Sequence, residues 1–405
     1  MRAGAPIVAI ALGLAQPVQA QSAYSDVPEP IRAATCARAD DWSARALARS
    51  LAPPLGLPPV AHPSDNPPSR AKIELGRKLF FDRRLSINKT MSCAMCHVPE
   101  QAFANWELQT AIGVEGRSTK RNAPTILNAA YYEGLFHDAR DPALETQYLA
   151  PLLARNEMAN PSAGGVIALL EALDGYPALF AEAFGAGPSL DRTGYALAAY
   201  QRSLIAGDTP FDRWYFGGEA EAVSDEVKRG FALFTDKADC ASCHTVEADH
   251  ALFTDQQLHD TGHGWLREQA RQAPPAATRV RVAPGVVHEV PLATIAAVSA
   301  AREADLGRYE VTEDPDDRWK FRTPSLRNVG VTRPYMHDGA LPSLAAVVSF
   351  YNQGGAGHPQ QDPRIRPLGL DAGEEAALVA FLEALTSPDI ACLAAEARIE
   401  PPDNH

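Results

Sequence analysis

Apolar residues recur at helical spacing in several stretches of the chain. The pattern is clearest over residues 71–81 and again over residues 227–234. Further helices are expected over residues 41–51, 165–184, 190–205, 343–351 and 372–385. Because no alternation of apolar and polar residues is sustained, the sequence predicts a mainly α fold.

Two of these stretches carry a weak internal repeat. The pattern Gly-x-x-Leu-Phe occurs at residues 76–80 and again at residues 230–234. A chain of 405 residues is also too long for one ordinary core, so we expect two related domains. The predicted division is a Pro-rich arm (21–68), a first domain (69–218), a second domain (219–390) with an insertion (264–305), and a tail (391–405).

Residues 1–20 have the pattern of a signal peptide. Arg2 is positively charged, residues 7–14 are apolar, and residues 18–20 (VQA) form a small-x-small cleavage site. A membrane anchor is the alternative, but the apolar run is much shorter than the ~20 residues that span a bilayer. No later apolar segment reaches that length. We therefore expect an exported protein that does not span a membrane, most simply in a bacterial periplasm.

The composition narrows the class of protein. Hydrophobic residues make up 46% of the chain and charged residues 21%, which is typical of a soluble globular protein. The formal net charge is −13, and a surface of that sign repels a phosphate backbone. General binding of nucleic acid is therefore not expected.

Four of the six cysteines lie in a motif with its own chemistry. Cys-x-x-Cys-His occurs as CAMCH at residues 93–97 and as CASCH at residues 240–244. Two thiols one helical turn apart can add to the vinyl groups of haem, and the following His then binds the iron. A redox disulfide or half of a zinc site is the alternative, but neither explains the repeated His. We expect two covalent haem c groups, held by Cys93, Cys96, His97, Cys240, Cys243 and His244.

The two remaining cysteines are Cys36 and Cys392, near opposite ends of the expected mature chain. In an exported protein they could form a disulfide that ties the Pro-rich arm to the C-terminal region. Otherwise they are free thiols, and the sequence leaves both alternatives open.

Further stretches accompany the two cysteine motifs. They are RNAPT (121–125), Pro151 followed by NEM (156–158), TPSLRN (323–328) and PYMHDG (334–339). Together these motifs resemble the bacterial di-haem cytochrome c peroxidase and MauG family, from about residue 68 to residue 385 outside the insertion. The resemblance implies two cytochrome c-like helical domains, each with one covalent haem, and hydrogen peroxide as the oxidant.

The first haem is expected to have an open sixth position. Peroxidases of the family carry a blocking His in the loop that matches residues 112–116, but residues 98–136 contain neither His nor Met. We therefore expect His97 to be its only strong ligand, with Lys120, Tyr131 and Tyr132 as alternative ligands.

The resemblance also implies a proton shuttle beside the first haem. Glu157 matches the family's distal acid, Gln147 its companion amide, and Pro151 lies between them at the family spacing. Such a group takes a proton from the bound oxygen and delivers it to the leaving one. The alternative for Glu157 is a solvated surface carboxylate.

Tyr351 matches the sixth ligand of the second haem, where peroxidases of the family have Met and MauG-like members have Tyr. A thioether favours reduced iron, whereas a phenolate favours oxidised iron. A packed aromatic at this position is the alternative, with Met336 or His337 binding the iron instead. His259 and His263 are further candidates in principle.

Two more expectations follow from the resemblance. His137 occupies the place of a Trp that usually lies between the haems, so charge transfer there would use Phe136, another aromatic or direct tunnelling. Asn122, Thr332 and Pro334 match a calcium site between the domains, and oxygen ligands suit that cation. An ordinary Asn before a turn is the alternative.

These observations predict a periplasmic di-haem c-type peroxidase of the MauG-like subgroup. Hydrogen peroxide would react at the first haem, and the second haem would share the oxidising equivalents as a second Fe(IV) centre. The electron donor would be a small cytochrome or a cupredoxin. One alternative is a MauG-like maturation enzyme that oxidises residues of a partner protein, and another is a di-haem electron carrier without catalysis.

Overall fold

The computed structural model describes residue 36 and residues 41–272, 277–283, 286–294 and 304–399. The expected signal peptide (1–20) lies outside the described residues, as does the first part of the Pro-rich arm apart from Cys36. The described residues are mainly helical, as predicted, and they contain only short strands.

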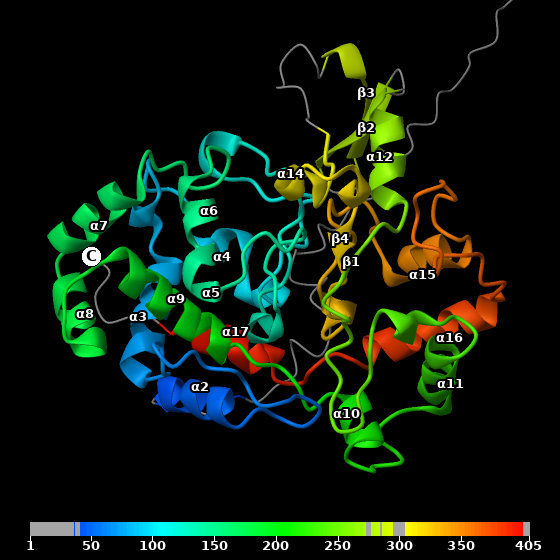
Figure 1. Ribbon diagram of the computed structural model, residues 1–405, viewed down its shortest axis with the longest axis horizontal. Helices are drawn as coiled ribbons and strands as arrows, with labels where there is room; N and C mark the ends of the chain where they lie inside the picture. Colours follow the sequence, from blue (N-terminus) through cyan, green and yellow to red (C-terminus); the bar gives the residue numbers. More distant parts are fainter. Residues whose placement is uncertain (1–35, 37–40, 273–276, 284–285, 295–303, 400–405) are drawn as a thin grey trace, which may run out of the picture.

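A first group of helices surrounds the CAMCH segment. At its centre α3 (Arg70–Phe81) packs against α9 (Leu190–Ser203) (Figure 1). The other helices of this group are α2 (Trp42–Leu51), α4 (Cys93–Cys96), α5 (Leu144–Gln147), α6 (Leu149–Leu153), α7 (Ala163–Ala172) and α8 (Tyr176–Phe184). Short 3-10 helices connect them: η3 (Arg83–Leu85), η4 (Pro99–Gln101), η5 (Val114–Gly116) and η6 (Ala129–Tyr131).

A second group of helices surrounds the CASCH segment. Its centre is the packing of α11 (Asp225–Thr235) against α16 (Ala372–Glu383) (Figure 1). The other helices are α10 (Pro210–Tyr215), α12 (His263–Gln272), α14 (Tyr309–Thr312) and α15 (Leu344–Asn352), with η7 (Cys240–Ser242), η8 (Pro315–Asp317) and η9 (Val329–Val331). β1 (Leu258–His259) pairs antiparallel with β4 (Phe321–Arg322).

The repeated glycine lies where the central helices touch in each group. A Cβ atom on Gly76 would lie 1.9 Å from the carbonyl oxygen of Ala196 in α9. A Cβ atom on Gly230 would lie 2.0 Å from the carbonyl oxygen of Ala377 in α16. Because only glycine lets two backbones approach so closely, the repeat marks the same helix contact twice.

The buried apolar side chains form two clusters, one for each group of helices. The first cluster runs from Ala46 to Ala206 and the second from Phe211 to Leu385. The first cluster also includes Ile390, Leu393 and Ala397, although they follow the whole second group in sequence. The chain therefore returns to its first core at its C-terminal end.

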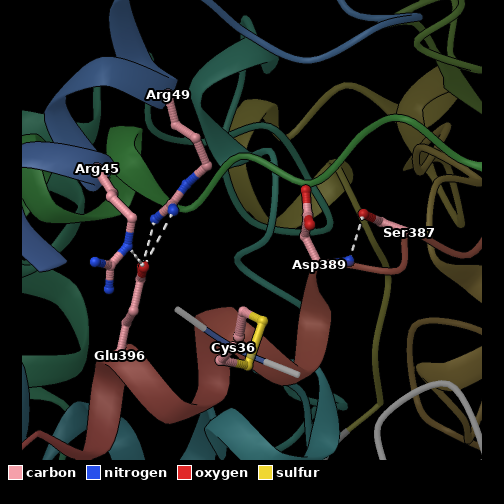
Figure 2. The surroundings of a disulfide bond; sticks show 7 residues. Cys36, Arg45, Arg49, Ser387, Asp389 and Glu396 are labelled. Atoms are coloured by element: carbon pink, nitrogen blue, oxygen red, sulfur yellow. Dashed lines mark hydrogen bonds and ion pairs between the residues drawn. A yellow bond between two sulfur atoms is a disulfide. The ribbon is translucent and has the colours of Figure 1, made fainter. Parts of the chain in front are cut away.

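These last residues form α17 (Ile390–Arg398), which corrects the expectation that the helices end at residue 385 and that a tail follows. A nine-residue, alanine-rich segment has little helix stability of its own, and packing onto the first core stabilises it. Figure 2 shows Cys36 bonded to Cys392 of α17, which confirms the disulfide alternative. Nearby, Glu396 pairs with Arg45 at 2.9 Å and with Arg49 at 2.8 Å.

Two further expectations were wrong in detail. The helix expected over residues 165–184 is divided into α7 and α8, because Gly175 has a φ of +85° and a proline occupies the first turn of α8. The insertion contains an antiparallel hairpin of β2 (Ala277–Ala283) and β3 (Val286–Pro291), which projects from the helices (Figure 1). Its alternation was too short to stand out in the sequence.

Among the described residues, no single helix has both the length and the apolar character needed to cross a membrane. Taken together α7 and α8 reach that length and composition, but they are bent by 102° relative to each other. Leu170 of α7 and Phe180 of α8 are fully buried in the first core.

Candidate active site

The first cysteine motif forms a short helix, and a histidine that could bind a metal follows it directly. α4 places Cys93 and Cys96 one turn apart, and His97 follows directly. The Nδ1 atom of His97 lies 3.0 Å from the carbonyl oxygen of Pro124 and 3.2 Å from that of Phe103. Burial lowers the pKa of His97, so the ring is neutral, Nδ1–H donates to the backbone, and Nε2 is left to bind iron.

A cavity of about 550 Å³ opens beside this motif. Cys93, Cys96 and His97 lie on its wall, and so do the residues that the sequence assigned to proton transfer. A volume of this size suits a cofactor. The predicted site residues that line it are Cys93, Cys96, His97, Asn122, Phe136, His137, Gln147, Pro151 and Glu157. The cavity and its donor set therefore fit a covalently attached haem.

Glu157 is a half-buried carboxylic acid at this cavity. Burial raises its pKa, and the positive charge of Arg140 only partly opposes that effect. The turn that carries Glu157 is fixed at its base, where the N–H of Met158 donates to the carbonyl oxygen of Pro151 at 3.1 Å. A carboxyl group with a raised pKa keeps its proton to a higher pH than an exposed one, which suits a group that must take up and release a proton.

The loop at residues 112–116, which matches the position of the blocking His in other peroxidases of the family, is fastened to that turn. A Cβ atom on Gly113 would lie 2.2 Å from the carbonyl oxygen of Asn156. The N–H of Val114 donates to the carbonyl oxygen of Glu157 at 2.9 Å. The loop thus has no room for a larger residue at position 113, and it helps to position the acid.

The alternative first-haem ligands are engaged elsewhere. Lys120 lies 2.5 Å from Glu310, and the hydroxyl of Tyr131 donates to the carbonyl oxygen of Pro58 at 3.0 Å. The hydroxyl of Tyr132 accepts a hydrogen bond from the N–H of Ser325 at 3.0 Å. The cavity wall also includes two thioethers that the sequence search over residues 98–136 did not cover, Met91 and Met158.

The second cysteine motif repeats the same proximal arrangement. The Nδ1 atom of His244 lies 2.8 Å from the carbonyl oxygen of Phe253, and the backbone carbonyl of Pro324 also interacts with the ring. Burial lowers the pKa of His244, so this ring is also neutral with Nε2 available to iron. Cys240 and Cys243 precede it in η7 and its C-cap, so the donor set fits a second haem.

Tyr351 of α15 faces this second cysteine pair. Burial raises the pKa of its phenol, and the neighbouring Cys240 and Cys243 raise it further. The phenol also makes a side-chain hydrogen bond with Thr261. A phenol in this environment keeps its proton until a cation such as iron replaces it.

The alternative second-haem ligands have other partners. His259 lies 2.8 Å from Asp255 and 2.9 Å from Asp362. His263 lies 2.9 Å from Asp338. The ring of His337 stacks on Phe321, with centroids 3.7 Å apart and planes 8° apart. Met336 has a φ of +71° in the turn before His337.

The two groups of helices meet through equivalent segments that the sequence search missed. Residues 121–141 and 321–341 share positive φ angles at Asn128 and Asn328 and the dipeptide His-Asp at 137–138 and 337–338. The carbonyl oxygen of each His accepts a backbone N–H from the other segment. The bonds run from Arg322 to His137 at 2.7 Å and from Asn122 to His337 at 2.8 Å. The shared Pro, Asn and His-Asp spacing was the available sequence signal.

His137 is fixed and neutral at this junction. Its Nε2 atom donates to the carbonyl oxygen of Asn122 at 3.0 Å. Burial, helped by the charge of Arg121, lowers the pKa of His137 to about 4. Its ring therefore braces the first segment internally, and its backbone carbonyl joins that segment to the second.

Two of the three residues matched to a calcium site, Asn122 and Pro334, lie beside the same backbone around Gln109 and Gly339. The side-chain amide of Asn122 donates to the carbonyl oxygen of Gln109 at 3.1 Å. A Cβ atom on Gly339 would lie 2.2 Å from that same oxygen and 3.1 Å from Pro334, and Thr332 precedes Pro334 by two positions. Amide and carbonyl oxygens are the ligand types that suit a hard cation, and the calcium site stays a prediction.

Comparisons with known proteins agree with this arrangement. The family model described as "Di-haem cytochrome c peroxidase" matches residues 70–220. The chain is 38% identical over 342 residues to "Cytochrome-c peroxidase IdrP1" of Denitromonas iodatirespirans, which covers 82% of this chain and 86% of that protein. It is 36% identical over 328 residues to "Methylamine utilization protein MauG" of Methylorubrum extorquens, which covers 80% and 81%.

A solved structure shows the same architecture. The crystal structure of "a MauG-like protein associated with microbial copper homeostasis" superimposes with a TM-score of 0.67 at 31% identity. The match covers 84% of this chain and 95% of that chain. The likeness therefore extends over both groups of helices.

Proposed function

The chain belongs to the di-haem cytochrome c peroxidase family and is a MauG-like peroxidase, and from this premise we propose that it reduces hydrogen peroxide in the periplasm at the cavity beside His97. The observation that carries the proposal is the shared cavity of Cys93, Cys96 and His97 with Glu157. When bound, the haem would supply an iron that exchanges electrons with the peroxide.

The residues of the chain would supply binding and proton transfer. Cys93 and Cys96 would hold the haem covalently, and His97 would bind its iron through Nε2. A carboxylate oxygen of Glu157 would take the proton from one peroxide oxygen and deliver it to the other. Gln147 would orient the peroxide by hydrogen bonding, while Pro151 fixes the turn that aims Glu157.

The second unit would store and pass electrons. Cys240, Cys243 and His244 would hold its haem, and Tyr351 would supply a phenolate oxygen to its iron. A phenolate ligand stabilises the oxidised iron relative to the reduced iron. Asn122, Thr332 and Pro334 would bind calcium between the units. The donor would be a small cytochrome or a cupredoxin.

The proposal is tested by substituting the acid. In Glu157→Gln we expect both haems to remain attached and peroxide-driven oxidation to fall by about 10²–10⁴-fold, the range for loss of a general acid or base. The matched control is Glu171→Gln on the exposed side of α7. Turnover of Glu157→Gln equal to that of the control would refute the role.

A second candidate function is favoured by the position of Tyr351. A protein that oxidises residues of a partner protein, as in MauG-like maturation, benefits from a second centre that tolerates high oxidation states. Steady-state turnover of peroxide with reduced cytochrome separates the two. Rapid turnover supports the peroxide-removing enzyme, and slow turnover with oxidation of a partner protein supports maturation. A carrier without catalysis would not use the buried acid at position 157.

A further inference from the structure

Tyr132 joins the first cavity to the second unit. Its ring lies on the wall of the cavity beside His97. Its hydroxyl accepts a hydrogen bond from the backbone N–H of Ser325, at 3.0 Å, although the two residues are 193 positions apart. The side chain thus begins at one haem site and ends at the backbone of the other.

The peptide group at the end of this contact also holds the proximal ligand of the second site. The N–H of Ser325 and the carbonyl of Pro324 belong to one peptide group, and that carbonyl interacts with the His244 imidazole beside the 2.8 Å hydrogen bond from Nδ1 to Phe253. One peptide group therefore separates the Tyr132 hydroxyl from the His244 imidazole. Hydrogen bonds on both sides of a peptide group polarise each other, so they act as one connected path.

The reverse connection does not occur among the described residues. The equivalent peptide bond is Pro124–Thr125, whose carbonyl oxygen lies 3.0 Å from Nδ1 of His97. The position equivalent to Tyr132 is Thr332, and within the described part of the chain no hydrogen bond joins it to Thr125. The link is therefore a special feature of the first segment and not a product of the repeat.

A cation fixes Tyr132 and keeps it from being oxidised itself. The guanidinium carbon of Arg322 lies 3.5 Å from the centroid of the Tyr132 ring. Arg322 is held by bonds to the carbonyl oxygens of Phe136 at 3.4 Å and Thr323 at 3.2 Å. A positive charge over the ring opposes removal of an electron from it. The ring can mediate tunnelling without becoming a radical.

We propose that Tyr132 is the electronic bridge between the two haem sites, coupling the first cavity to His244 through the Pro324–Ser325 peptide group. The inference rests on the proposed function only in requiring a haem at each cysteine motif. One electron leaves the second iron, which is oxidised, and reaches the first iron, which is reduced. Tyr132 keeps its proton and its electrons throughout.

The test compares two adjacent tyrosines in the haem-loaded protein. Tyr132→Phe removes the hydroxyl that meets Ser325, and Tyr131→Phe removes a hydroxyl that meets Pro58 instead. Pulse radiolysis adds a single electron, and its redistribution between the haems is followed by absorbance. We expect a several-fold slower exchange in Tyr132→Phe and the wild-type rate in Tyr131→Phe.

A second measurement separates the bridge from a merely structural role. Loss of the Tyr132 hydroxyl makes the Pro324 carbonyl a weaker acceptor, so the His244 ring donates less charge to its iron. The midpoint potential of the second haem should therefore rise in Tyr132→Phe and remain unchanged in Tyr131→Phe. An unchanged exchange rate in Tyr132→Phe, or equal slowing in both variants, would overturn the bridge.

A second variant at position 132 and the absence of peroxide from the measurement complete the test. If Tyr132→Phe loads haem poorly, Tyr132→Leu removes the ring as well, and slower exchange is again expected, with wild-type exchange overturning the proposal. Because pulse radiolysis uses no peroxide, the bridge is judged separately from the proposed reaction. A wild-type protein with rapid haem-to-haem exchange but no peroxide turnover would contradict the proposed function alone.

Discussion

The two cysteine motifs have the same proximal side and different distal sides. In both, a glycine lets two central helices touch, and a neutral His donates to two backbone carbonyls, one of them a proline's. On the distal side, however, the first motif faces a cavity with a carboxylic acid, and the second faces a buried phenol. In the proposed function the repeated part would hold a haem, and the part that differs would decide what that haem can do.

The largest expected effect concerns the shared part. We expect Gly76→Ala and Gly230→Ala each to lower the free energy of unfolding by about 3 kcal/mol, because the added methyl meets a backbone carbonyl that cannot move away cheaply. Denaturant titration followed by circular dichroism measures both, with Gly187→Ala, which has open space around it, as control. A large effect in only one variant would show that the two helix contacts are not equivalent.

The next effect concerns the distal side of the first motif alone. Gly113→Val should displace the Asn156–Glu157 turn and lower peroxide turnover by roughly 10²-fold, since displacements of about 1 Å have effects of that size. Gly164→Ala in α7, where a Cβ meets nothing within 4 Å, is the control. Haem content should not change. Normal turnover in Gly113→Val would mean that the loop does not position the acid.

The pH dependence of turnover tests the same asymmetry. Glu157 must be ionised to accept a proton. Because its pKa is raised, turnover should begin to fall, as the pH is lowered, at a higher pH than the titration range of an ordinary Glu. The fall should approach tenfold per pH unit below that pKa. A profile of kcat/KM against pH measures it, and the residual activity of Glu157→Gln should lack this limb. If the fall in kcat/KM at low pH persists in that variant, a group other than Glu157 causes it.

The smallest effect on peroxide chemistry is expected at the second motif. Tyr351→Phe should change the absorption and EPR spectra of the second haem and raise its potential, while the first haem still reacts with peroxide at the wild-type rate. Tyr335→Phe, whose hydroxyl donates to the carbonyl oxygen of Val329 at 2.8 Å, is the control. Unaltered spectra in Tyr351→Phe would remove the phenol from the second iron.

Local features of the chain could be predicted from its sequence because they depend on short spacings. The cysteine motifs, the repeated glycine and most helix positions belong to this class. The meeting of Gln147, Pro151 and Glu157 beside His97 was also within reach, since these residues follow one another closely and match a family pattern. Their chemical roles stay predictions.

Features that depend on packing between distant segments could not be predicted in the same way. α17 is too short to be stable alone, and nothing in its own residues indicates that it joins the first core. The contact of Tyr132 with Ser325 likewise depends on how the two segments meet. The equivalence of residues 121–141 and 321–341 was present in the sequence, but the four identical residues became noticeable only when the backbones could be compared.

The position of α17 has a consequence for the order in which the protein is built. The first core needs Leu393 and Ala397, and its covalent closure needs Cys392, so residues made last complete the domain that was made first. During synthesis the residues around the first motif are therefore left with an incomplete core until α17 has been made. Cooperative closure of the first core thus depends on a segment that follows the whole second group of helices in sequence.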